Sequence, residues 1–294
     1  MSLNHLRTFI EAFRCHSLSE AAENLGITQP AVSQHIASLE AQLGKTLFVR
    51  QARGVLPTVL AQDLAAQIGD GLDRAELALA TMRARSAELS GGIQIAGPAE
   101  LMSEKVAPVL GRLTEAGLQV RLLLGGRASI YDALLNGDVD LAFTASQPDD
   151  VRLASQAIGS ERLFAVASPT TAAQIESWRD LKAALQSVPH VAYDVDRPLL
   201  REWCDWNGVD LKAQQPSVTA SDIRLLRTLV ETNVGWSVIP DYLCQSGIER
   251  GSIVRLKGAK EPPKNTFYLV WAKSALRSPR VAYTRTMLLE TLAK

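Results

Sequence analysis

Apolar and polar positions in the first 45 residues follow helical spacing and are interrupted by turn signals. Residues three or four apart give the first segment one apolar face: Leu3, Leu6, Phe9, Ile10 and Phe13. Ser17 and Glu20 form a capping box for a second helix, which Gly26 ends in a left-handed turn. Thr28 can cap a third helix, in whose first turn Pro30 loses no hydrogen bond. The pattern predicts three helices, the last two joined by a tight turn.

The third helix carries short polar side chains on its outward face. These are Gln29, Ser33, Gln34 and Ser38, while Ala31, Val32, Ile36 and Leu39 face inward. A helix of this kind after a tight turn is how a helix-turn-helix enters the major groove of DNA. Glutamine can pair with adenine, and Pro30 and Ala31 can pack on thymine methyl groups. Together with Thr28 at the cap, these residues are candidate DNA contacts, although they could also form an ordinary solvated face.

A small cationic hairpin follows the third helix. Gly44 ends the helix, and residues 47–56 predict two short strands joined by a tip. Its cations are Lys45, Arg50 and Arg53, and no acidic residue lies between positions 40 and 63. Cations grouped beside a recognition helix form a wing that can reach phosphate or the minor groove. The sequence therefore predicts that these three residues contact DNA.

A long helix is predicted from an N-cap at Thr58 to about Glu88. Its apolar residues form one stripe: Leu60, Leu64, Ile68, Leu72, Ala75, Leu79 and Met82. One chain is not expected to bury a stripe on a helix roughly 45 Å long, so we expect the same helix of a second subunit to cover it. Packing on the protein's own larger domain is the alternative. Gly69 and Gly71 indicate a bend or the close approach of that partner. Twofold pairing would make the DNA target an interrupted palindrome.

Apolar runs alternate with helical segments beyond a break at 90–92. The runs cover 93–96, 120–124, 139–143, 163–167, 191–193, 236–239 and 267–271. Alternation of this kind predicts an α/β domain with a mostly parallel sheet.

Composition limits the other classes of protein. Net charge is zero, from 31 basic and 31 acidic residues, so any cations that bind DNA must be locally placed. We find no signal-peptide pattern and no apolar run of roughly 20 residues, and we expect a cytoplasmic protein without membrane contact. The cysteines, Cys15, Cys204 and Cys244, are far apart and favour neither disulfides nor a zinc site, so we expect no cofactor or metal.

An enzyme and a cytoplasmic small-molecule-binding protein are the alternative functions. The histidines are His5, His16, His35 and His190, and none is in a metal-binding pair. The sequence also lacks a nucleophile elbow and a phosphate loop. Either alternative would use the N-terminal helices only for interaction. The N-terminal segment instead favours a DNA-binding protein that is not an enzyme.

The N-terminal segment closely resembles the LysR-type transcriptional regulator family. The matching residues keep the family's order and spacing without a gap: Ala21, Ala22, Leu25, Thr28, Gln29, Pro30, Ala31, Val32, Ser33, Ile36, Leu39, Glu40, Leu43, Gly44, Leu47, Phe48, Arg50 and Arg53. Pro57, Leu60 and Ala61 depart from the family's usual leucine and Ala-Gly pair. These departures can alter the angle at which the next helix leaves the DNA-binding domain.

The resemblance implies an α + α/β chain in three parts. Residues 1–58 would form a winged helix-turn-helix, 59–89 a linker helix that dimerises, and 91–294 an effector-binding domain like a type 2 periplasmic binding protein. Its first lobe would comprise about 91–160 and 270–294 and its second about 161–269, with a cleft between them and two crossover strands. The family further implies a homodimer or homotetramer that binds double-stranded DNA, responds to a small-molecule effector and contacts RNA polymerase.

The turns that follow the strands are the expected effector-binding positions, because ligands of open α/β sheets bind beyond the carboxyl ends of the strands. The candidates are Pro98, Ala99, Glu100, Leu101, Gly126, Arg127, Thr144 and Ser146, and in the other lobe Tyr193, Asp194, Ser221, Asp222 and Gly235. Asn233 stands where the family usually has glycine, and asparagine tolerates the left-handed conformation.

Glu100 bears on the chemistry of the effector. The family commonly has serine or threonine in this turn, where hydroxyls and helix amides hold a carboxylate. A carboxylate at Glu100 would repel an anion and, with Asp194 and Asp222, could hold an amine. We therefore expect an effector with a positive group, such as a basic amino acid or polyamine, with Arg127 available for a carboxylate end. The alternative is that Glu100 points to solvent as a favourable first-turn charge.

Overall fold

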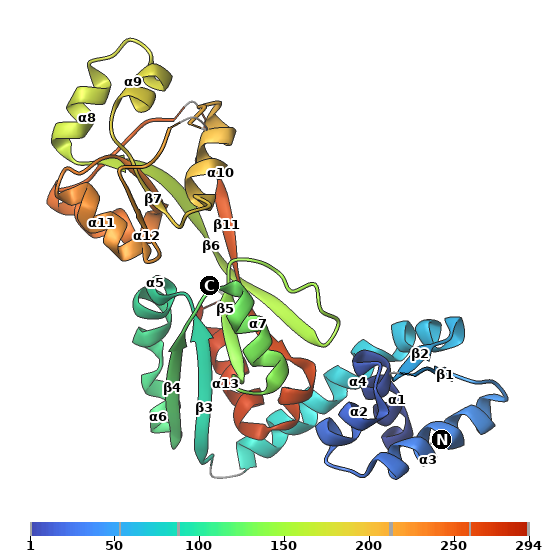
Figure 1. Ribbon diagram of the computed structural model, residues 1–294. Helices are drawn as coiled ribbons and strands as arrows, with labels where there is room; N and C mark the ends of the chain where they lie inside the picture. The colour runs from blue at the N-terminus through green and yellow to red at the C-terminus, as the bar shows by residue number, and fades with distance from the viewer. Residues whose placement is uncertain (1, 53, 87–88, 212–213, 259, 293–294) are drawn as a thin grey trace.

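A small helical domain, a long helix and a larger α/β domain follow one another along the chain in the computed structural model, which describes residues 2–52, 54–86, 89–211, 214–258 and 260–292 (Figure 1). The small domain contains α1 (Leu3–Cys15), α2 (Leu18–Leu25), α3 (Gln29–Leu43), β1 (Phe48–Arg50) and β2 (Val55–Pro57). The long helix is α4 (Val59–Ser86).

The caps of the small domain lie where the sequence predicted them. Ser17 Oγ accepts a hydrogen bond from the Glu20 amide at 3.2 Å, and Thr28 Oγ1 accepts one from the Ala31 amide at 3.4 Å. Gly26 ends α2 in the left-handed conformation. The helices enclose a core that includes Phe9, Ile10, Ala21, Val32, Ile36, Leu39 and Leu47. The prediction of three helices with a tight turn between the last two is confirmed.

The β1–β2 hairpin is fixed to the helices through side-chain and backbone contacts. Glu40 Oε1 on α3 accepts a hydrogen bond from the Leu47 amide at 2.6 Å. The Val55 amide donates to the carbonyl oxygen of His16 at 2.9 Å. A Cβ at Gly54, where φ is 86°, would overlap this same oxygen. Glycine therefore lets the hairpin approach α1 closely.

The first half of the apolar stripe of α4 packs against the chain's own small domain. Four residues of the stripe pack against the core of α1 to α3: Leu60, Leu64, Ile68 and Leu72. These four side chains are only partly buried, so coverage of the stripe by the same helix of a second subunit stays a prediction. A Cβ at Gly69 would lie 3.8 Å from Ile10 Cδ1, so the close approach expected there is made by α1 of the same chain.

The C-terminal end of α4 packs on the larger domain on one side and is exposed on the other. Leu77 packs against the core of the larger domain, whereas Leu79 is 53% and Met82 68% exposed. The larger domain thus covers one side of α4. Packing of α4 on this domain was the alternative to its pairing with a second subunit. Leu79 and Met82 are the most exposed large apolar side chains of the stripe.

The larger domain alternates strands and helices. One lobe, here lobe one, contains β3 (Gly91–Gly97), α5 (Ala99–Leu101), η1 (Met102–Val106), η2 (Ala107–Val109), α6 (Gly111–Glu115), β4 (Leu118–Leu124), α7 (Arg127–Asn136), β5 (Leu141–Thr144), η3 (Lys273–Arg277) and α13 (Pro279–Leu292). The other, lobe two, contains α8 (Pro169–Glu176), α9 (Leu181–Ser187), β7 (Val191–Tyr193), α10 (Pro198–Asn207), β8 (Val218–Ala220), α11 (Ile223–Glu231), β9 (Ser237–Pro240), α12 (Asp241–Arg250) and β10 (Val254–Arg255). The strands β6 (Leu153–Ala167) and β11 (Lys264–Ala272) belong to both.

The main sheet has the strand order β10-β6-β11-β5-β3-β4, and β9 also pairs with β6. Among the described residues, only the pairs β3–β4, β3–β5 and β7–β8 are parallel strand pairs. The pairs that involve β6 or β11 are antiparallel. The expectation of a mostly parallel sheet is therefore wrong, because two strands that cross between the lobes in opposite directions must pair antiparallel with each other.

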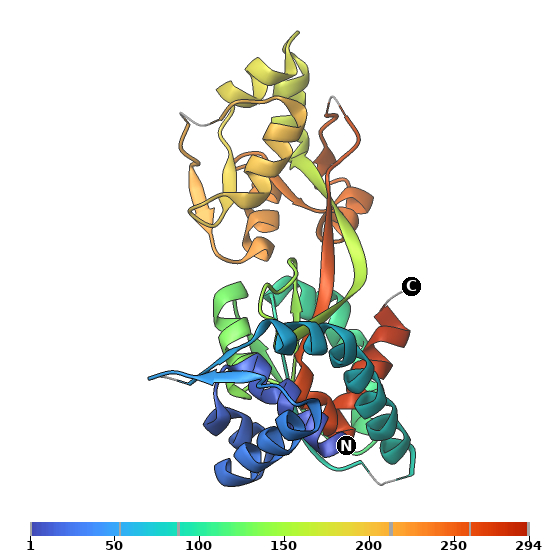
Figure 2. The ribbon, with the colours of Figure 1, turned by 90° about the vertical axis from the view of Figure 1, so that its right-hand side faces the viewer.

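Two crossover strands connect the lobes, as expected (Figure 2). β6 pairs with β9 and β10 of lobe two through its last residues, and β11 pairs with β5 of lobe one through Tyr268 to Val270. The apolar run 163–167 is only the end of β6, whose middle holds polar residues and Gly159, and the run 267–271 omits the polar first residues of β11. The predicted bounds of the two lobes stay predictions.

Candidate functional site

Helix α3 presents the predicted DNA-reading side chains on one exposed side. Gln29, Pro30 and Gln34 are exposed, whereas Ala31, Ser33 and Ser38 are half-buried. Gln29 Nε2 donates a hydrogen bond to Ser33 Oγ at 3.0 Å. This contact orders the two side chains but leaves Gln34 with its full amide edge toward solvent, as base recognition requires.

The wing carries its cations beside this helix. Lys45 and Arg50 are both exposed, and Arg50 ends β1. The hairpin projects away from the three helices (Figure 2). Arg53, the third predicted cation, lies outside the described residues. The geometry leaves Lys45 and Arg50 accessible to a phosphate backbone.

The predicted effector residues of lobe one lie at the carboxyl ends of its strands. Pro98 and Ala99 join β3 to α5, and Gly126 precedes α7, which begins at Arg127. The side chain of Arg127 lies outside what the structure describes. Thr144 is buried, and its hydroxyl donates to the carbonyl oxygen of Ser146 at 2.7 Å. The Tyr131 hydroxyl donates to the same oxygen at 2.7 Å and fixes this turn.

Glu100 faces lobe two and is not a solvent-directed charge. Its exposure is only 9%, which contradicts the alternative that it points to solvent. Burial raises the pKa of Glu100, the charge of Asp222 raises it further, and Arg224 opposes them. Burial and the charges of Glu100, Asp194 and Asp222 likewise raise the pKa of Tyr193. The start of α5 in lobe one and the start of α11 in lobe two therefore lie within electrostatic reach of each other.

The other two acids of the predicted amine site are already engaged. Asp222 caps α11 and binds Arg224 through two oxygens, with Arg224 Nη2 at 2.6 Å from Asp222 Oδ2. The hydrogen bond from Arg224 lowers the pKa of Asp222. Asp194 Oδ1 accepts a hydrogen bond from the Val195 amide at 2.6 Å. Of these three acids, Asp222 is therefore the one held by a cation, whereas Asp194 is held by a backbone amide.

Leu101 and Gly235 have packing roles. Leu101 is buried in the core of lobe one. A Cβ at Gly235 would lie 2.5 Å from the Pro189 carbonyl oxygen, so glycine is needed there for close packing. Asn233 has a φ of 66°, as expected for a residue replacing glycine. Ser221 is exposed just before α11.

Sequence reasoning missed Glu161, which lies in the middle of β6. The side chain is 4% exposed, and its Oε1 accepts a hydrogen bond from Asn265 Nδ2 of β11 at 3.0 Å. Burial raises the pKa of Glu161 to about 8. The hydrogen bond from Asn265 lowers this pKa, whereas the charges of Glu100, Asp241 and Glu202 raise it. Its signal in the sequence was an acid two residues before the apolar run that starts at Leu163.

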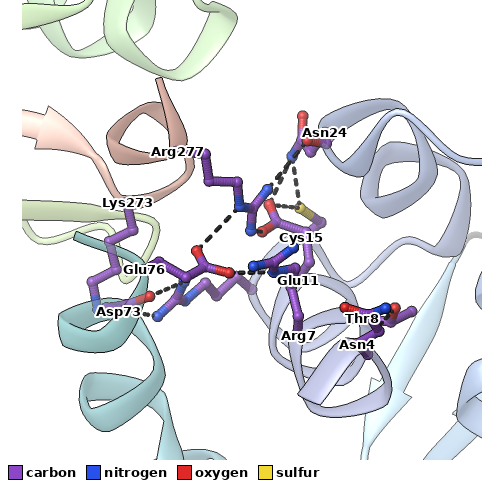
Figure 3. Close-up of polar contacts among 11 residues, drawn as sticks. Asn4, Arg7, Thr8, Glu11, Cys15, Asn24, Asp73, Glu76, Lys273 and Arg277 are labelled. Atoms are coloured by element: carbon purple, nitrogen blue, oxygen red, sulfur yellow. Dashed lines mark hydrogen bonds and ion pairs between the residues drawn. The ribbon is translucent and has the colours of Figure 1, made fainter. Parts of the chain in front are cut away.

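An ion-pair network joins the DNA-binding domain to lobe one, and sequence reasoning missed it as well (Figure 3). Arg277 of η3 donates to Glu11 Oε2 of α1 at 2.8 Å and to Glu76 Oε2 of α4 at 3.2 Å. Its Nη1 donates to the Asn24 carbonyl oxygen of α2 at 3.2 Å. Glu76 also binds Arg7 of α1. One residue of the larger domain thus contacts all three of α1, α2 and α4.

Two further pairs reinforce this contact. Arg14 of α1 binds Asp73 of α4 through two oxygens at 3.0 and 2.5 Å, and Lys273 Nζ lies 3.9 Å from Asp73. Arg152, just before β6, lies 3.1 Å from Glu20 of α2. Arg152 and Lys273 therefore stand at the lobe-one ends of the two crossover strands.

Metal chemistry and membrane insertion find no support in the described part of the chain. No cluster of three or more His, Cys, Asp or Glu residues there could hold a metal ion. No helix among the same residues is long and apolar enough to cross a membrane.

Two family models match the chain. Residues 3–62 match the bacterial regulatory helix-turn-helix protein of the lysR family, and residues 86–293 match the LysR substrate binding domain. The HTH-type transcriptional regulator AbaB from Streptomyces antibioticus is 34% identical over 96% of this chain and 95% of that protein. The regulator TrpI from Pseudomonas aeruginosa is 27% identical over 99% of this chain and 98% of that protein.

Solved structures share the fold along the whole chain. The LysR-type regulator CrgA from Neisseria meningitidis superimposes with a TM-score of 0.61 at 22% identity, covering 100% of both chains. LysG from Corynebacterium glutamicum, solved with bound effector Arg, superimposes with a TM-score of 0.55 at 20% identity, covering 100% of both chains. The two family models and the 34% identical relative are of transcriptional regulators, not of enzymes. The chain belongs to the LysR family of transcriptional regulators, with an N-terminal helix-turn-helix DNA-binding domain and a C-terminal effector-binding domain.

Proposed function

We propose that this regulator reads an interrupted palindrome in double-stranded DNA as a homodimer or homotetramer, under the control of a small molecule with a positive group. The exposed face of α3 beside the cationic wing supports the DNA-binding part. We include contact with RNA polymerase in the proposal.

The DNA contacts are assigned to the cap, the outward face of α3 and the wing. Gln29, Ser33 and Gln34 read base edges, while Lys45 and Arg50 bind phosphates. A mobility shift on the protein's own promoter region tests this assignment with Gln34→Ala and Arg50→Ala. Gln42→Ala, exposed near the other end of α3, is the matched control. Unchanged affinity in both test variants would remove the assignment.

The class of effector is proposed from the buried acid that faces lobe two. Glu100 is 9% exposed, and Asp222 opposite is already bound by Arg224. A buried carboxylate needs an opposite charge or hydrogen bonds to offset its desolvation, and a cationic group of a ligand can supply both. A basic amino acid or polyamine supplies such a cation, and LysG, which shares the fold, was solved with arginine. A thermal-shift screen of cationic against anionic metabolites tests the class, because a ligand that binds the native state raises its melting temperature.

The signal is proposed to pass from the crossover strands to the DNA-binding domain through Arg277. β11 ends at Ala272, and the next five residues form η3, which carries both Lys273 and Arg277. A change in the angle between the lobes moves the ends of β6 and β11, and these ends hold α1, α2 and α4. Coupling of this kind is reciprocal, so DNA must change effector affinity by the same factor.

Pairing of two subunits is assigned to the end of α4. Leu79 and Met82 are exposed there, on a helix whose first half is already packed on its own domain. Two DNA-binding domains arranged about a twofold axis then read two half-sites. Sedimentation of the purified protein measures whether two or four subunits associate.

A further inference from the structure

A cavity of about 670 Å³ lies where η1 of lobe one, α12 of lobe two and both crossover strands meet. Of the residues predicted to bind the effector, only Leu101 lines it, and the described residues of α7, β5, β7 and α11 contribute nothing to its lining. The turns assigned to the effector therefore do not form this cavity. Its volume is within the range of small-molecule sites, roughly 300 to 1,000 Å³.

The apolar part of the lining belongs to lobe one. It consists of Leu101, Val106, Ile158, Phe267 and Leu292. The first four are buried in the core of lobe one, and Leu292, the last residue of α13, packs against that core. A hydrocarbon group that lies on this part of the lining leaves water together with the apolar surface it covers, which favours binding.

Two backbone irregularities coincide at the cavity. Phe267 of β11 pairs with Gly159 of β6. The next residue, Tyr268, pairs with Ala157, so Ile158 is an extra residue of β6. A bulge of this kind re-aims a side chain and is common next to active sites. In addition, η1 is a π-helix, a form that occurs frequently at functional sites. Both irregular segments contribute residues to the lining.

The charged part of the lining contains two cations and one acid. Arg162 of β6 and Asp241 of α12 bind each other at 3.0 Å. The other cation, Lys105 of η1, has its Nζ 5.3 Å from the centre of the Tyr242 ring, and no ion pair among the described residues includes it. Lys105 is therefore available to bind a carboxylate that enters the cavity.

Nearby acids do not cancel this charge at neutral pH. Burial raises the pKa of Tyr242, and the charges of Glu161, Glu100, Glu104 and Asp241 raise it further. Only Asp241 of these acids lines the cavity. Glu161 has a pKa of about 8 and is largely protonated at neutral pH. Burial also raises the pKa of Glu100, and the charge of the exposed Glu104 is screened by solvent.

We propose that this cavity is a further small-molecule site for an apolar carboxylate, whose carboxyl group binds Lys105 and whose hydrocarbon part covers the apolar lining. A ligand there contacts both lobes, so it binds one arrangement of the lobes more tightly than the others. Its binding therefore changes the affinity for the effector. The inference goes beyond the proposed function and depends neither on the DNA contacts nor on the cationic effector.

The test compares carboxylates with neutral compounds of nearly the same shape. Octanoate and cyclohexylacetate are the carboxylate probes, and their amides are the neutral counterparts. Calorimetric affinity is measured for the full chain, for Lys105→Met and for Ser160→Leu. Methionine keeps an unbranched side chain without the charge, and leucine at the exposed Ser160 fills part of the cavity without changing a charge. Lys182→Met, exposed on α9 of lobe two, is the matched control.

At least one carboxylate is expected to bind the full chain and Lys182→Met about tenfold more tightly than its amide does, because a charge-assisted contact is lost in the amide. Its affinity should fall by about the same factor in Lys105→Met and in Ser160→Leu. Retained affinity in both variants would place the ligand outside this cavity and overturn the site. A loss in Ser160→Leu alone would overturn the role of Lys105 and the carboxylate class.

Failure of both carboxylates to bind the unaltered chain would also overturn the proposal. DNA binding and the cationic effector, which are tested separately, would stand.

Discussion

Arg277 Nε donates a hydrogen bond to Glu76 Oε2 at 3.2 Å, and this contact joins the effector-binding domain to the linker helix. The side chain of Arg277 is 23% exposed and that of Glu76 only 7%. Burial opposes the charge of Arg277, but Glu11 and Glu76 raise its pKa above the ordinary value. Removing the arginine from such a buried cluster costs free energy, because the two carboxylates are left without their cation.

Removal of Arg277 should destabilise the whole chain. Arg277→Ala leaves Glu11 and Glu76 buried without their shared cation, and we expect a loss of about 3 to 5 kcal/mol in the free energy of unfolding, as for other broken buried pairs. Urea denaturation measures it. Arg280→Ala, which loses only a 4.0 Å pair with Asp140, is the control and should cost at most about 1 kcal/mol. Equal losses in the two variants would show that the contact is no stronger than a surface pair.

Gln34→Ala should weaken DNA binding at one base position. The side chain is exposed on the N-terminal half of α3. Loss of a base-reading glutamine should cost about 1 to 3 kcal/mol and relax specificity at that position only. Binding measured across a library of single-base variants of the target resolves the effect. A uniform loss across all positions would assign Gln34 to the phosphate backbone.

Arg50→Ala should reduce the dependence of DNA affinity on salt concentration. Arg50 ends β1 at the exposed wing. A phosphate contact releases counterions, so its removal should lower the slope of log affinity against log salt by about 1 while specificity stays the same. Titration of binding at several salt concentrations measures the slope, with Gln42→Ala as the reference. An unchanged slope would place Arg50 outside the interface.

Stability should depend on pH through Glu161. Its pKa is raised from an ordinary 4.5 to about 8, so the folded state binds this proton more tightly than the unfolded state. The resulting stability is fully present below pH 4.5 and is lost as pH rises through 8. Glu161→Gln lacks this component. The difference in unfolding free energy between the two proteins should therefore change in favour of the variant from pH 5 to 9, and parallel curves would contradict the burial argument.

Leu79→Glu should weaken association of the subunits. Leu79 is 53% exposed on α4, so the monomer can accept the change, but a charge in an apolar contact between two helices is unfavourable. Analytical ultracentrifugation should show a dissociation constant raised at least tenfold, with the far-UV spectrum unchanged. Gln67→Glu, exposed on the first half of α4, is the control. Unaltered association would place the interface elsewhere.

The DNA-binding domain could be predicted almost completely because its signals are local. Caps at Ser17 and Thr28, and the left-handed glycines that end the helices, depend only on neighbouring residues. The apolar runs similarly located β3, β4, β5, β7 and β9 of the larger domain, but not the short strands β8 and β10. The full length of β6 and the start of β11 escaped prediction, because those residues lack a regular apolar pattern.

The candidate effector site was predicted less well because its residues interact across the chain. Glu100 was identified from its position after a strand, but its burial was not evident from the sequence. The role of Asp222 changed because Arg224, two residues away, folds back onto it. Glu161 was missed because nothing in a single strand shows which acid a second lobe will bury.

The sequence by itself determined the helix-turn-helix, the family and the strand positions, since these depend on short-range periodicity, capping and motif spacing. Tertiary structure decided what α4 packs against within the chain, which acids are buried and how the domains are joined. Arg277 lies more than 200 residues from Glu76 and Glu11, and only the folding of the chain brings these charges together. Burial then makes their contact strong, because charges removed from water must be paired.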